Sequence, residues 1–299
     1  MVDLIIKNGL SQATITSNGR IKSLILNSIV VIDSSNTSTD TLQQDKCYLM
    51  FPWQGRLSCD KIIKKISNDD NLIIPNRDSN DYPIHGLVLS TNKILKESKE
   101  ASVTFILQHK FNFPSIEETY TISANELMIQ TKLLNQSDEA QYFYYGYHPF
   151  ICFNNLTIND MMINSNCNKL IQTSSEVLPY VNDKGEYIIE DHSFISKPIL
   201  NDEYDNLFYN STSEDTFIEL YNKELNVSVG VRNISTINDN KQIPFNYIQI
   251  YTPTSRKEIC FEPLTAPTNA FNIKFPTYTN SLQPKEIAMS QLAIYIKKY

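Results

Sequence analysis

Apolar and polar residues alternate with a period of two along most of the chain. In Ser102–Phe111 (SVTFILQHKF), every second residue from Val103 to Phe111 falls on one side, and Thr104, Gln108 and Lys110 fall on the other. Successive side chains of a β-strand point to opposite faces, so this alternation is typical of a half-buried strand. The pattern predicts one strand over the whole segment.

Two longer segments have the pattern of β-hairpins. Ile116–Gln136 is expected to turn near Ala124, and Phe217–Val231 near Asn222, with β-branched and aromatic residues on both arms. Further strands are predicted over shorter apolar runs: Ser23–Ile32, Tyr142–Phe153, Phe245–Tyr251, Glu258–Phe261 and Leu292–Tyr299.

Helical periodicity is weak, and its best example is the short amphipathic segment Cys59–Ile66. Many short strands joined by polar loops indicate a β-sandwich or barrel. No internal repeat, low-complexity linker or shift in composition marks a boundary between domains. We therefore predict an all-β fold with a single domain over residues 1–299.

Composition excludes several classes of partner. The 299 residues carry a net charge of −7 with scattered Lys and Arg, so no nucleic-acid-binding surface is expected. No apolar run approaches the roughly 18 residues of a membrane span, and the N-terminus, with Asp3, does not have the pattern of a signal peptide. Five cysteines without a CxxC pair favour reduced thiols. We expect a cytoplasmic protein, monomeric or homodimeric, with no membrane partner.

Two of the four histidines stand in unusual surroundings. His148 lies in YFYYGYHPFICF among seven aromatic residues, and the following Pro149 restricts its backbone. His85, in DYPIHGL, precedes a glycine, which indicates a turn or a close approach of another segment. His109 and His192 are better explained as a strand residue and a solvated loop residue.

Among the carboxylates, Glu262 stands out in EICFEPLTAPTNAFN. It follows a short apolar strand and precedes a proline, so burial and a raised pKa are expected. Arg56 follows the only tryptophan and a turn glycine, whereas Asp205 is unremarkable by itself. A zinc site formed by His85, His148 and Glu262 is formally possible, but no local spacing requires it. The motifs of other common enzyme classes are absent.

Five segments, in this order, resemble conserved blocks of the aldose 1-epimerase (galactose mutarotase) family. They extend over residues 51 to 272: FPWQGRL resembles the block PWPGRI, YPIHGLVLS resembles LHGLVRW, YGYHPFICF resembles the HPYF block, and YDNLF and CFEPLTAPTNAFN resemble the two that follow. Five blocks in the order of the family make a far more specific signal than any one of them.

The resemblance implies a β-supersandwich fold and interconversion of the α and β anomers of a free aldose. It implies that Glu262 is the catalytic base, His148 the catalytic acid and His85 a second active-site histidine. Arg56 and Asp205 match residues that hold sugar hydroxyls. No metal or organic cofactor is implied, and the expected partner is a small-molecule sugar.

The chain also departs from the pattern of the family. Leu89 replaces an arginine, in a position expected to lie in the wall of the sugar cleft, and Leu264 replaces a glutamine. Two alternatives therefore stay open. A hexose-6-phosphate 1-epimerase would need an arginine-based phosphate site, for which Arg77 is the candidate. A non-catalytic sugar-binding protein would not need both Glu262 and His148.

Overall fold

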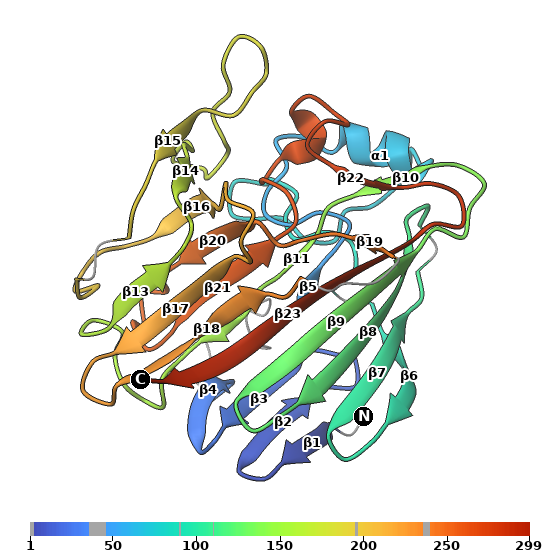
Figure 1. The fold of residues 1–299 in the computed structure, drawn as a ribbon. Coiled ribbons are helices and arrows are strands. Elements are labelled where there is room, and N and C mark those ends of the chain that lie inside the picture. Colours follow the sequence, from blue (N-terminus) through green and yellow to red (C-terminus); the bar gives the residue numbers. More distant parts are fainter. Residues whose placement is uncertain (1–2, 36–45, 90, 110, 195–196, 236–239) are drawn as a thin grey trace.

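A computed structural model of the protein describes residues 3–35, 46–89, 91–109, 111–194, 197–235 and 240–299 (Figure 1). Strands account for most of its regular structure, as the period-two pattern predicts. The helices in these residues are one α-helix, α1 (Lys61–Ser67), and a single 3₁₀ turn, η2 (Ala270–Asn272). The all-β fold class is therefore confirmed, and the predicted helix Cys59–Ile66 begins two residues later than expected.

A nine-stranded sheet in the described residues crosses the molecule in Figure 1, in the order β13-β17-β18-β23-β9-β8-β7-β6, with β19 beside β23. Its strands are β6 (Lys93–Ser98), β7 (Ser102–Leu107), β8 (Ser115–Ile122), β9 (Glu126–Leu134), β13 (Met162–Ser165), β17 (Phe217–Asn222), β18 (Val227–Asn233), β19 (Lys241–Gln242) and β23 (Ile287–Lys298). Burial alternates residue by residue along β8 and β9, which form the first predicted hairpin. Strands β17 and β18 form the second.

A second sheet has eight strands in the part of the chain that the structure describes, in the order β15-β14-β16-β20-β21-β11-β5, with β12 beside β21. Its strands are β5 (Leu49–Met50), β11 (Gly146–Tyr147), β12 (Phe150–Ile151), β14 (Lys169–Ile171), β15 (Ile189–Asp191), β16 (Asp205–Tyr209), β20 (Tyr247–Tyr251) and β21 (Ile259–Leu264). All six residues of β21 are buried, because strands flank it on both edges and both of its faces are covered.

Two smaller sheets complete the architecture. The four-stranded sheet consists of β1 (Leu4–Asn8), β2 (Ser11–Ile15), β3 (Ile21–Leu26) and β4 (Ile29–Asp33); the two-stranded sheet pairs β10 (Gln141–Phe143) with β22 (Asn280–Leu282). A single hydrophobic cluster joins the first of these sheets to both large ones, through residues such as Leu24, Ile129 and Ile248. The division of the chain into domains stays a prediction.

Three predicted strands differ most from the structure; smaller differences are that Leu292–Tyr299 begins earlier, at Ile287, and that Glu258–Phe261 extends to Leu264. Ser23–Ile32 is a hairpin of β3 and β4, because Asn27 and Ser28 adopt positive φ angles of 46° and 69° and turn the chain. The strand that begins at Ser102 ends at Leu107, so His109 lies in the following loop, where its Nε2 is 2.9 Å from the carbonyl oxygen of Pro114.

The third wrong extent concerns the aromatic segment Tyr142–Phe153, which is divided among three short strands. Strand β10 pairs with β22, β11 pairs with β5 and β21, and β12 pairs with β21 alone. Gly146 permits the close approach of β11 to β21, since a Cβ there would lie 2.6 Å from the carbonyl oxygen of Pro263. The segment is thus a series of corners between sheets, which a run of aromatic residues does not reveal.

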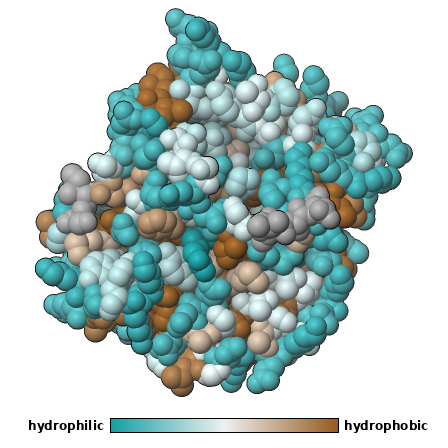
Figure 2. Space-filling view, in the orientation of Figure 1, coloured by the Kyte–Doolittle hydropathy of each residue, from teal (hydrophilic) through white to brown (hydrophobic). Residues whose placement is uncertain are grey.

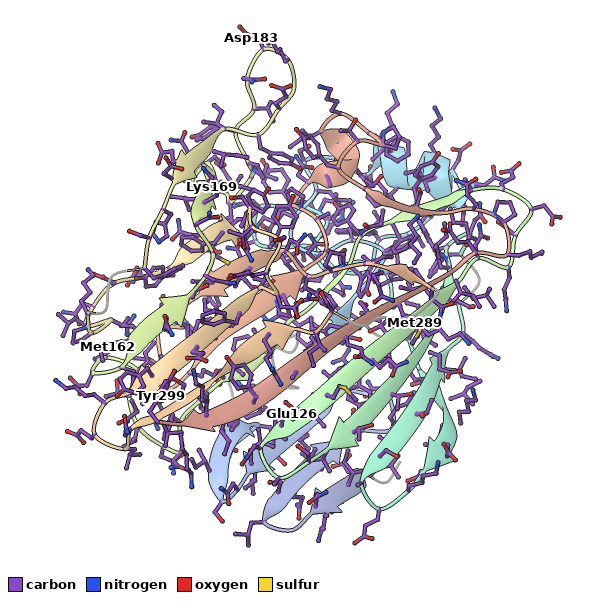
Figure 3. The ribbon with its side chains drawn as sticks, in the orientation of Figure 1. Glu126, Met162, Lys169, Asp183, Met289 and Tyr299 are labelled. Atoms are coloured by element: carbon purple, nitrogen blue, oxygen red, sulfur yellow. The ribbon has the colours of Figure 1, made fainter. Side chains whose placement is uncertain are left out.

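A hairpin that includes β14 and β15 projects from the rest of the molecule. Lys169 lies at its base and Asp183 at its tip (Figure 3). Hydrophilic residues dominate the face seen in Figure 2, and hydrophobic residues occur there in small, separate groups. In the described residues, no helix has the length and apolar character that crossing a membrane would require.

Candidate active site

A pocket of about 430 Å³ contains all five residues proposed from the sequence. We call it the inner pocket. Its lining comprises Tyr48, Gly55, Arg56, Arg77, Asp78, Ser79, Ile84, His85, His148, Val177, Asp205, Gln249, Tyr251, Glu262 and Thr268. Its volume falls within the range of small-molecule sites in proteins.

The floor of the inner pocket is one face of the eight-stranded sheet. Glu262 on β21 lies opposite Gln249 on β20, and Tyr251 on β20 lies opposite Asp205 on β16. Gln249 and Tyr251 are two residues apart, so their side chains point to the same face. His148 follows β11, the strand that pairs with β21. Strand register therefore brings together residues that are far apart in the sequence.

The imidazole of His148 is held between two aromatic rings. It stacks on Tyr48 with ring centroids 4.9 Å apart, and Phe150 lies at the same centroid distance. Its backbone N–H donates to the carbonyl oxygen of Tyr48 at 3.0 Å. Burial lowers the pKa of His148 to about 3, because a charged imidazolium would lose its hydration there.

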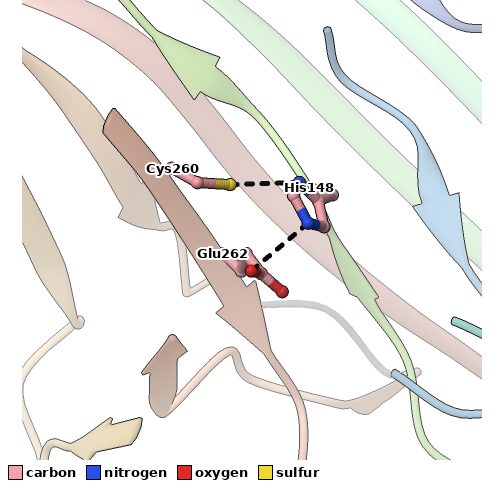
Figure 4. Close-up of side chains that lie close together, drawn as sticks. All are labelled: His148, Cys260 and Glu262. Atoms are coloured by element: carbon pink, nitrogen blue, oxygen red, sulfur yellow. Dashed lines mark hydrogen bonds and ion pairs between the residues drawn. The ribbon is translucent and has the colours of Figure 1, made fainter. Parts of the chain in front are cut away.

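Glu262 lies beside His148, with its Oε1 3.4 Å from Nε2 of the imidazole (Figure 4). Burial and the nearby charge of Asp205 raise the pKa of Glu262 well above its usual value, and Arg56 acts in the opposite direction. Sequence reasoning correctly indicated a buried carboxylate, although the strand continues past it to Leu264. These pKa shifts favour neutral Glu262 and neutral His148, whereas a base and an acid that are ready to react would be ionised Glu262 and protonated His148.

Cys260 contacts the other nitrogen of the same imidazole. Its Sγ lies 3.0 Å from Nδ1 of His148, and its thiol donates to the carbonyl oxygen of Pro149 at 3.2 Å. Cys260, His148 and Glu262 are a group whose possible ligand atoms lie within 4.8 Å of one another. The imidazole ring stands between the thiol and the carboxylate, however, so one ion could not use both of its nitrogens (Figure 4). The thiol and the carboxylate thus lie against different nitrogens of His148.

His85 reaches the pocket from a strained turn. Its φ angle is +57° and that of Gly86 is +81°. A Cβ at Gly86 would lie 2.1 Å from the carbonyl oxygen of Phe51, so the close approach expected after His85 is present. The His85 ring meets that of His148 edge-on, with centroids 5.0 Å apart.

One nitrogen of His85, the buried Nδ1, has no hydrogen-bond partner among the described residues. Burial lowers the pKa of His85 well below its usual value, and the proximity of His148 and Arg56 further disfavours a second positive charge there. A neutral imidazole can both donate and accept a hydrogen bond, which suits a hydroxyl group.

The guanidinium of Arg56 is held by Asp78, which sequence reasoning missed. Nε of Arg56 donates to Oδ2 of Asp78 at 2.6 Å. Burial favours the neutral carboxyl, but the hydrogen bonds from Arg56 and from the backbone N–H groups of Tyr82 and Asn80 outweigh it, so the pKa of Asp78 is lowered. Asp78 therefore stays ionised and fixes the orientation of Arg56.

Asp205 and Gln249 form a polar pair on the floor of the pocket. Nε2 of Gln249 donates to Oδ1 of Asp205 at 2.7 Å. Burial raises the pKa of Asp205, although Arg56 and Gln249 act against it. Oε1 of Gln249 is buried without a hydrogen-bond partner among the described residues. The available sequence signal was a single polar residue inside the apolar strand YIQIY.

The structure corrects the expected position of Leu89. Sequence reasoning placed it in the wall of the sugar cleft, but it is buried and does not line the inner pocket. It packs instead in a small hydrophobic cluster with Tyr48, Met50 and Leu264. Its carbonyl oxygen accepts a hydrogen bond from Arg20, whose guanidinium lies 5.8 Å from the ring centre of Tyr48.

Neither protein-family models nor curated proteins match this chain, but solved structures do. An Escherichia coli K12 protein provisionally named an aldose 1-epimerase is 12% identical, with coverage of 100% of this chain and 99% of that one and a TM-score of 0.76. A galactose mutarotase-like protein from Clostridium acetobutylicum is 17% identical over 99% and 95% of the two chains, with a TM-score of 0.73. One from Lactobacillus casei is 17% identical over 99% and 100%, with a TM-score of 0.70. The chain therefore has the galactose mutarotase-like fold that its sequence resemblance predicts.

Proposed function

We propose that the protein is an aldose 1-epimerase that interconverts the α and β anomers of a free aldose. The observation that carries this proposal is the 3.4 Å separation of Glu262 Oε1 and His148 Nε2 in the inner pocket. Anomerisation needs a base at O1 and an acid at O5, and these two oxygens are bonded to the same carbon. A base and an acid that are immediate neighbours match that requirement.

The proton transfers balance within this pair. In the first half, Glu262 takes the O1 proton, the C1–O5 bond breaks, and His148 gives a proton to O5. The open-chain aldehyde then rotates about C1–C2. In the second half, His148 takes the O5 proton while O5 attacks the other face of C1, and Glu262 returns a proton to O1.

The pKa shifts of Glu262 and His148 are consistent with this reaction scheme. Neutral Glu262 and neutral His148, which burial favours, are the forms that accompany the open-chain sugar. A carboxylate with a raised pKa is also a stronger base, so burial helps Glu262 to remove the O1 proton. Arg56 favours the ionised carboxylate of Glu262, and hydroxyl groups of the bound cyclic sugar stabilise the charged forms that start the reaction.

Other polar atoms of the pocket are suited to the remaining hydroxyls. Nδ1 of His85 and Oε1 of Gln249 are buried without partners among the described residues, and such atoms in a pocket call for ligand hydrogen bonds. The terminal nitrogens of Arg56 and the carboxylate of Asp205 complete a mixed set of donors and acceptors. Tyr251, which is half-buried, offers an aromatic surface for sugar C–H groups.

The charge of the pocket favours a free aldose over a hexose 6-phosphate. Both arginines that line it are engaged by carboxylates: Arg56 by Asp78, and Arg77 by Asp60 at 3.2 Å. Nη1 of Arg77 also donates to the carbonyl oxygen of Asp81 at 2.6 Å. A phosphate would have to compete for these donors in a pocket that already holds several carboxyl groups.

Exchange between the anomers, measured by NMR or polarimetry on α-glucose and α-galactose, tests the proposal. Glu262→Gln and His148→Asn should each lower kcat by about 10²–10⁴-fold, the usual range for one acid–base group. His192→Asn, a change of a histidine outside the inner pocket, is the matched control and should have no effect. Sugar binding without any exchange would instead favour a non-catalytic sugar-binding protein, and full activity in both site variants would refute the mechanism.

A further inference from the structure

His148 and Glu262 face each other across a gap in the backbone pairing of their strands. The cross-strand pairs that flank them are Gly146–Leu264 on β11 and Phe150–Cys260 on β12. Counting inward from either pair places His148 opposite Glu262. Strand β11 ends just before His148, and β12 begins two residues after it, so the antiparallel ladder is interrupted at the proposed acid and base.

Two prolines weaken the ladder on both sides of this gap. The backbone N–H of Phe261 donates to the carbonyl oxygen of Pro149 at 3.3 Å, which identifies the residues directly before and after His148 as the hydrogen-bonding positions. Each such residue would exchange two bonds with its partner on β21. Pro149 provides no N–H for one exchange, and Pro263, the partner of Tyr147, provides none for the other. Half of the backbone bonds expected around the proposed acid and base therefore cannot form.

Tyr147, the residue before His148, reaches from this gap to the nine-stranded sheet. Its side chain is buried, and its hydroxyl donates to Oε1 of Glu118 on β8 at 2.7 Å. Because the hydrogen of Tyr147 is used in that bond, the hydroxyl of Thr131 on β9, also at 2.7 Å, is the donor to Tyr147. The side chain of Tyr147 is thus bonded to one large sheet, while its backbone belongs to the other.

Glu118 is a fixed anchor for this tyrosine. It is fully buried, and its other oxygen, Oε2, forms an ion pair with Nζ of Lys93, whose side chain is also buried. Nζ of Lys93 donates in turn to the carbonyl oxygen of Gly19 at 3.3 Å, in the connection between β2 and β3. A hydrogen bond to an ionised group is about twice as strong as one between neutral groups. The hydroxyl of Tyr147 is therefore held by a charge that is itself held in place.

Tyr145 provides a comparison within the same segment. Its side chain is also buried, and its hydroxyl forms a hydrogen bond with Ser290 of the nine-stranded sheet. Its backbone, however, is bonded to Thr265 in both directions. The N–H of Tyr145 donates to the hydroxyl of Thr265 at 2.9 Å, and its carbonyl oxygen accepts the backbone N–H of Thr265 at 2.9 Å. The backbone of Tyr145 thus has a support that prolines partly remove at Tyr147.

We propose that Tyr147, anchored by Glu118, is a positioning residue that sets the separation of His148 and Glu262. The inference rests on the proposed function, because it concerns the acid and the base of that reaction. Tyr147 does not line the inner pocket, so it acts through the adjacent backbone of His148 and not on the sugar. The nine-stranded sheet thereby takes part in aligning a pair of residues carried by the eight-stranded sheet.

Tyr147→Phe removes the hydroxyl and keeps the ring, and Tyr145→Phe is the matched control. We expect Tyr147→Phe to lower kcat for anomer exchange about tenfold with KM nearly unchanged, since a displacement of roughly 1 Å costs up to about 10²-fold. It should also shift the nitrogen NMR signals of the His148 imidazole, which are identified by their absence from His148→Asn. Tyr145→Phe should lower the urea midpoint by a similar amount and change neither kcat nor these signals.

Glu118→Gln tests the anchor. Combined with Tyr147→Phe, it should lower kcat no further than the larger of the two single losses, because both residues act on His148 through the same bond. If Glu118→Gln does not fold, kcat and the His148 signals of Tyr147→Phe decide the question.

Unchanged kcat and unshifted His148 signals in folded Tyr147→Phe, or an equal loss of kcat in Tyr145→Phe, would overturn the inference. Shifted His148 signals in Tyr147→Phe, with no anomer exchange by the wild type, would support the positioning role and refute the proposed function instead.

Discussion

Sγ of Cys260 lies 3.0 Å from Nδ1 of His148, on the side of the imidazole opposite to Glu262. Because the thiol donates to the carbonyl oxygen of Pro149, its sulfur accepts the hydrogen on Nδ1. This fixes the tautomer of His148 and leaves Nε2 as the nitrogen that would exchange protons in the proposed reaction. Burial, with the charge of Glu262 second, raises the pKa of Cys260 well above its usual value, so the thiol positions His148 and is not a nucleophile.

Cys260→Ala should therefore lower kcat by about two- to tenfold, the equivalent of one ordinary hydrogen bond, with KM nearly unchanged. Cys260 does not line the inner pocket, so sugar binding should not depend on it directly. Cys260→Ser, which restores a hydroxyl acceptor, should recover most of kcat. NMR exchange kinetics measure both constants, and equal changes in kcat and KM, or no recovery with serine, would contradict the positioning role.

The alternation of side chains predicted those strands whose two faces differ in polarity. Ile116–Gln136 is the best example, because every second residue of β8 and β9 packs on the core. Tyr142–Phe153 has no such contrast, since most of its residues are buried. The points at which this segment changes from one strand to the next depend on its partners β22, β5 and β21. These partners lie far away in the sequence, so no local pattern predicts them.

The residues of the candidate site also form two groups, those that the sequence singles out and those that only the fold brings into contact. Glu262 and His148 attract notice from residue type and the proline that follows each of them. Gln249 and Cys260 matter because of their positions relative to these two residues. Gln249 is the cross-strand neighbour of Glu262, and Cys260 reaches the far side of the His148 ring. Such relations follow from strand register, which the sequence does not reveal by itself.

Gln249→Leu removes from the lining of the inner pocket both the donor to Asp205 and a buried acceptor without a partner among the described residues. We expect KM to rise about two- to tenfold, since an ordinary hydrogen bond to a neutral ligand group is worth roughly 0.5–1.5 kcal/mol. Gln291→Leu, on the nine-stranded sheet, is the matched control. Saturation kinetics with glucose give the comparison, and a KM equal to that of the control variant would remove Gln249 from the binding site.

The buried His85 makes stability depend on pH with a definite sign. Because its pKa is lowered in the folded state, the unfolded chain binds a proton below about pH 6.5 and the folded protein does not. The free energy of unfolding therefore falls as pH decreases, by up to about 1.4 kcal/mol per pH unit for this group. Urea unfolding of the wild type and of His85→Asn at pH 7 and pH 5 isolates its contribution. The difference between the two proteins should shrink or reverse at pH 5, and a constant difference would contradict the assignment.

The ion pair of Lys46 and Glu258 stabilises the region behind His148. Nζ of Lys46 lies 2.8 Å from Oε1 of Glu258, and both side chains are buried. Burial raises the pKa of Glu258, and Lys46 opposes that shift. The backbone carbonyl of Lys46 accepts the N–H of Phe150, whose ring contacts His148, so the pair also anchors the segment that carries the proposed acid.

Lys46→Met should lower the free energy of unfolding by about 3–5 kcal/mol, because it leaves the carboxylate of Glu258 buried and unpaired. The double variant Lys46→Met with Glu258→Leu should be distinctly less destabilised, since no charge is then left without a partner. Urea denaturation of the wild type, both single variants and the double variant completes the thermodynamic cycle. If the double variant were as unstable as the two single losses added together, the two residues would act independently and the pair would not be the anchor.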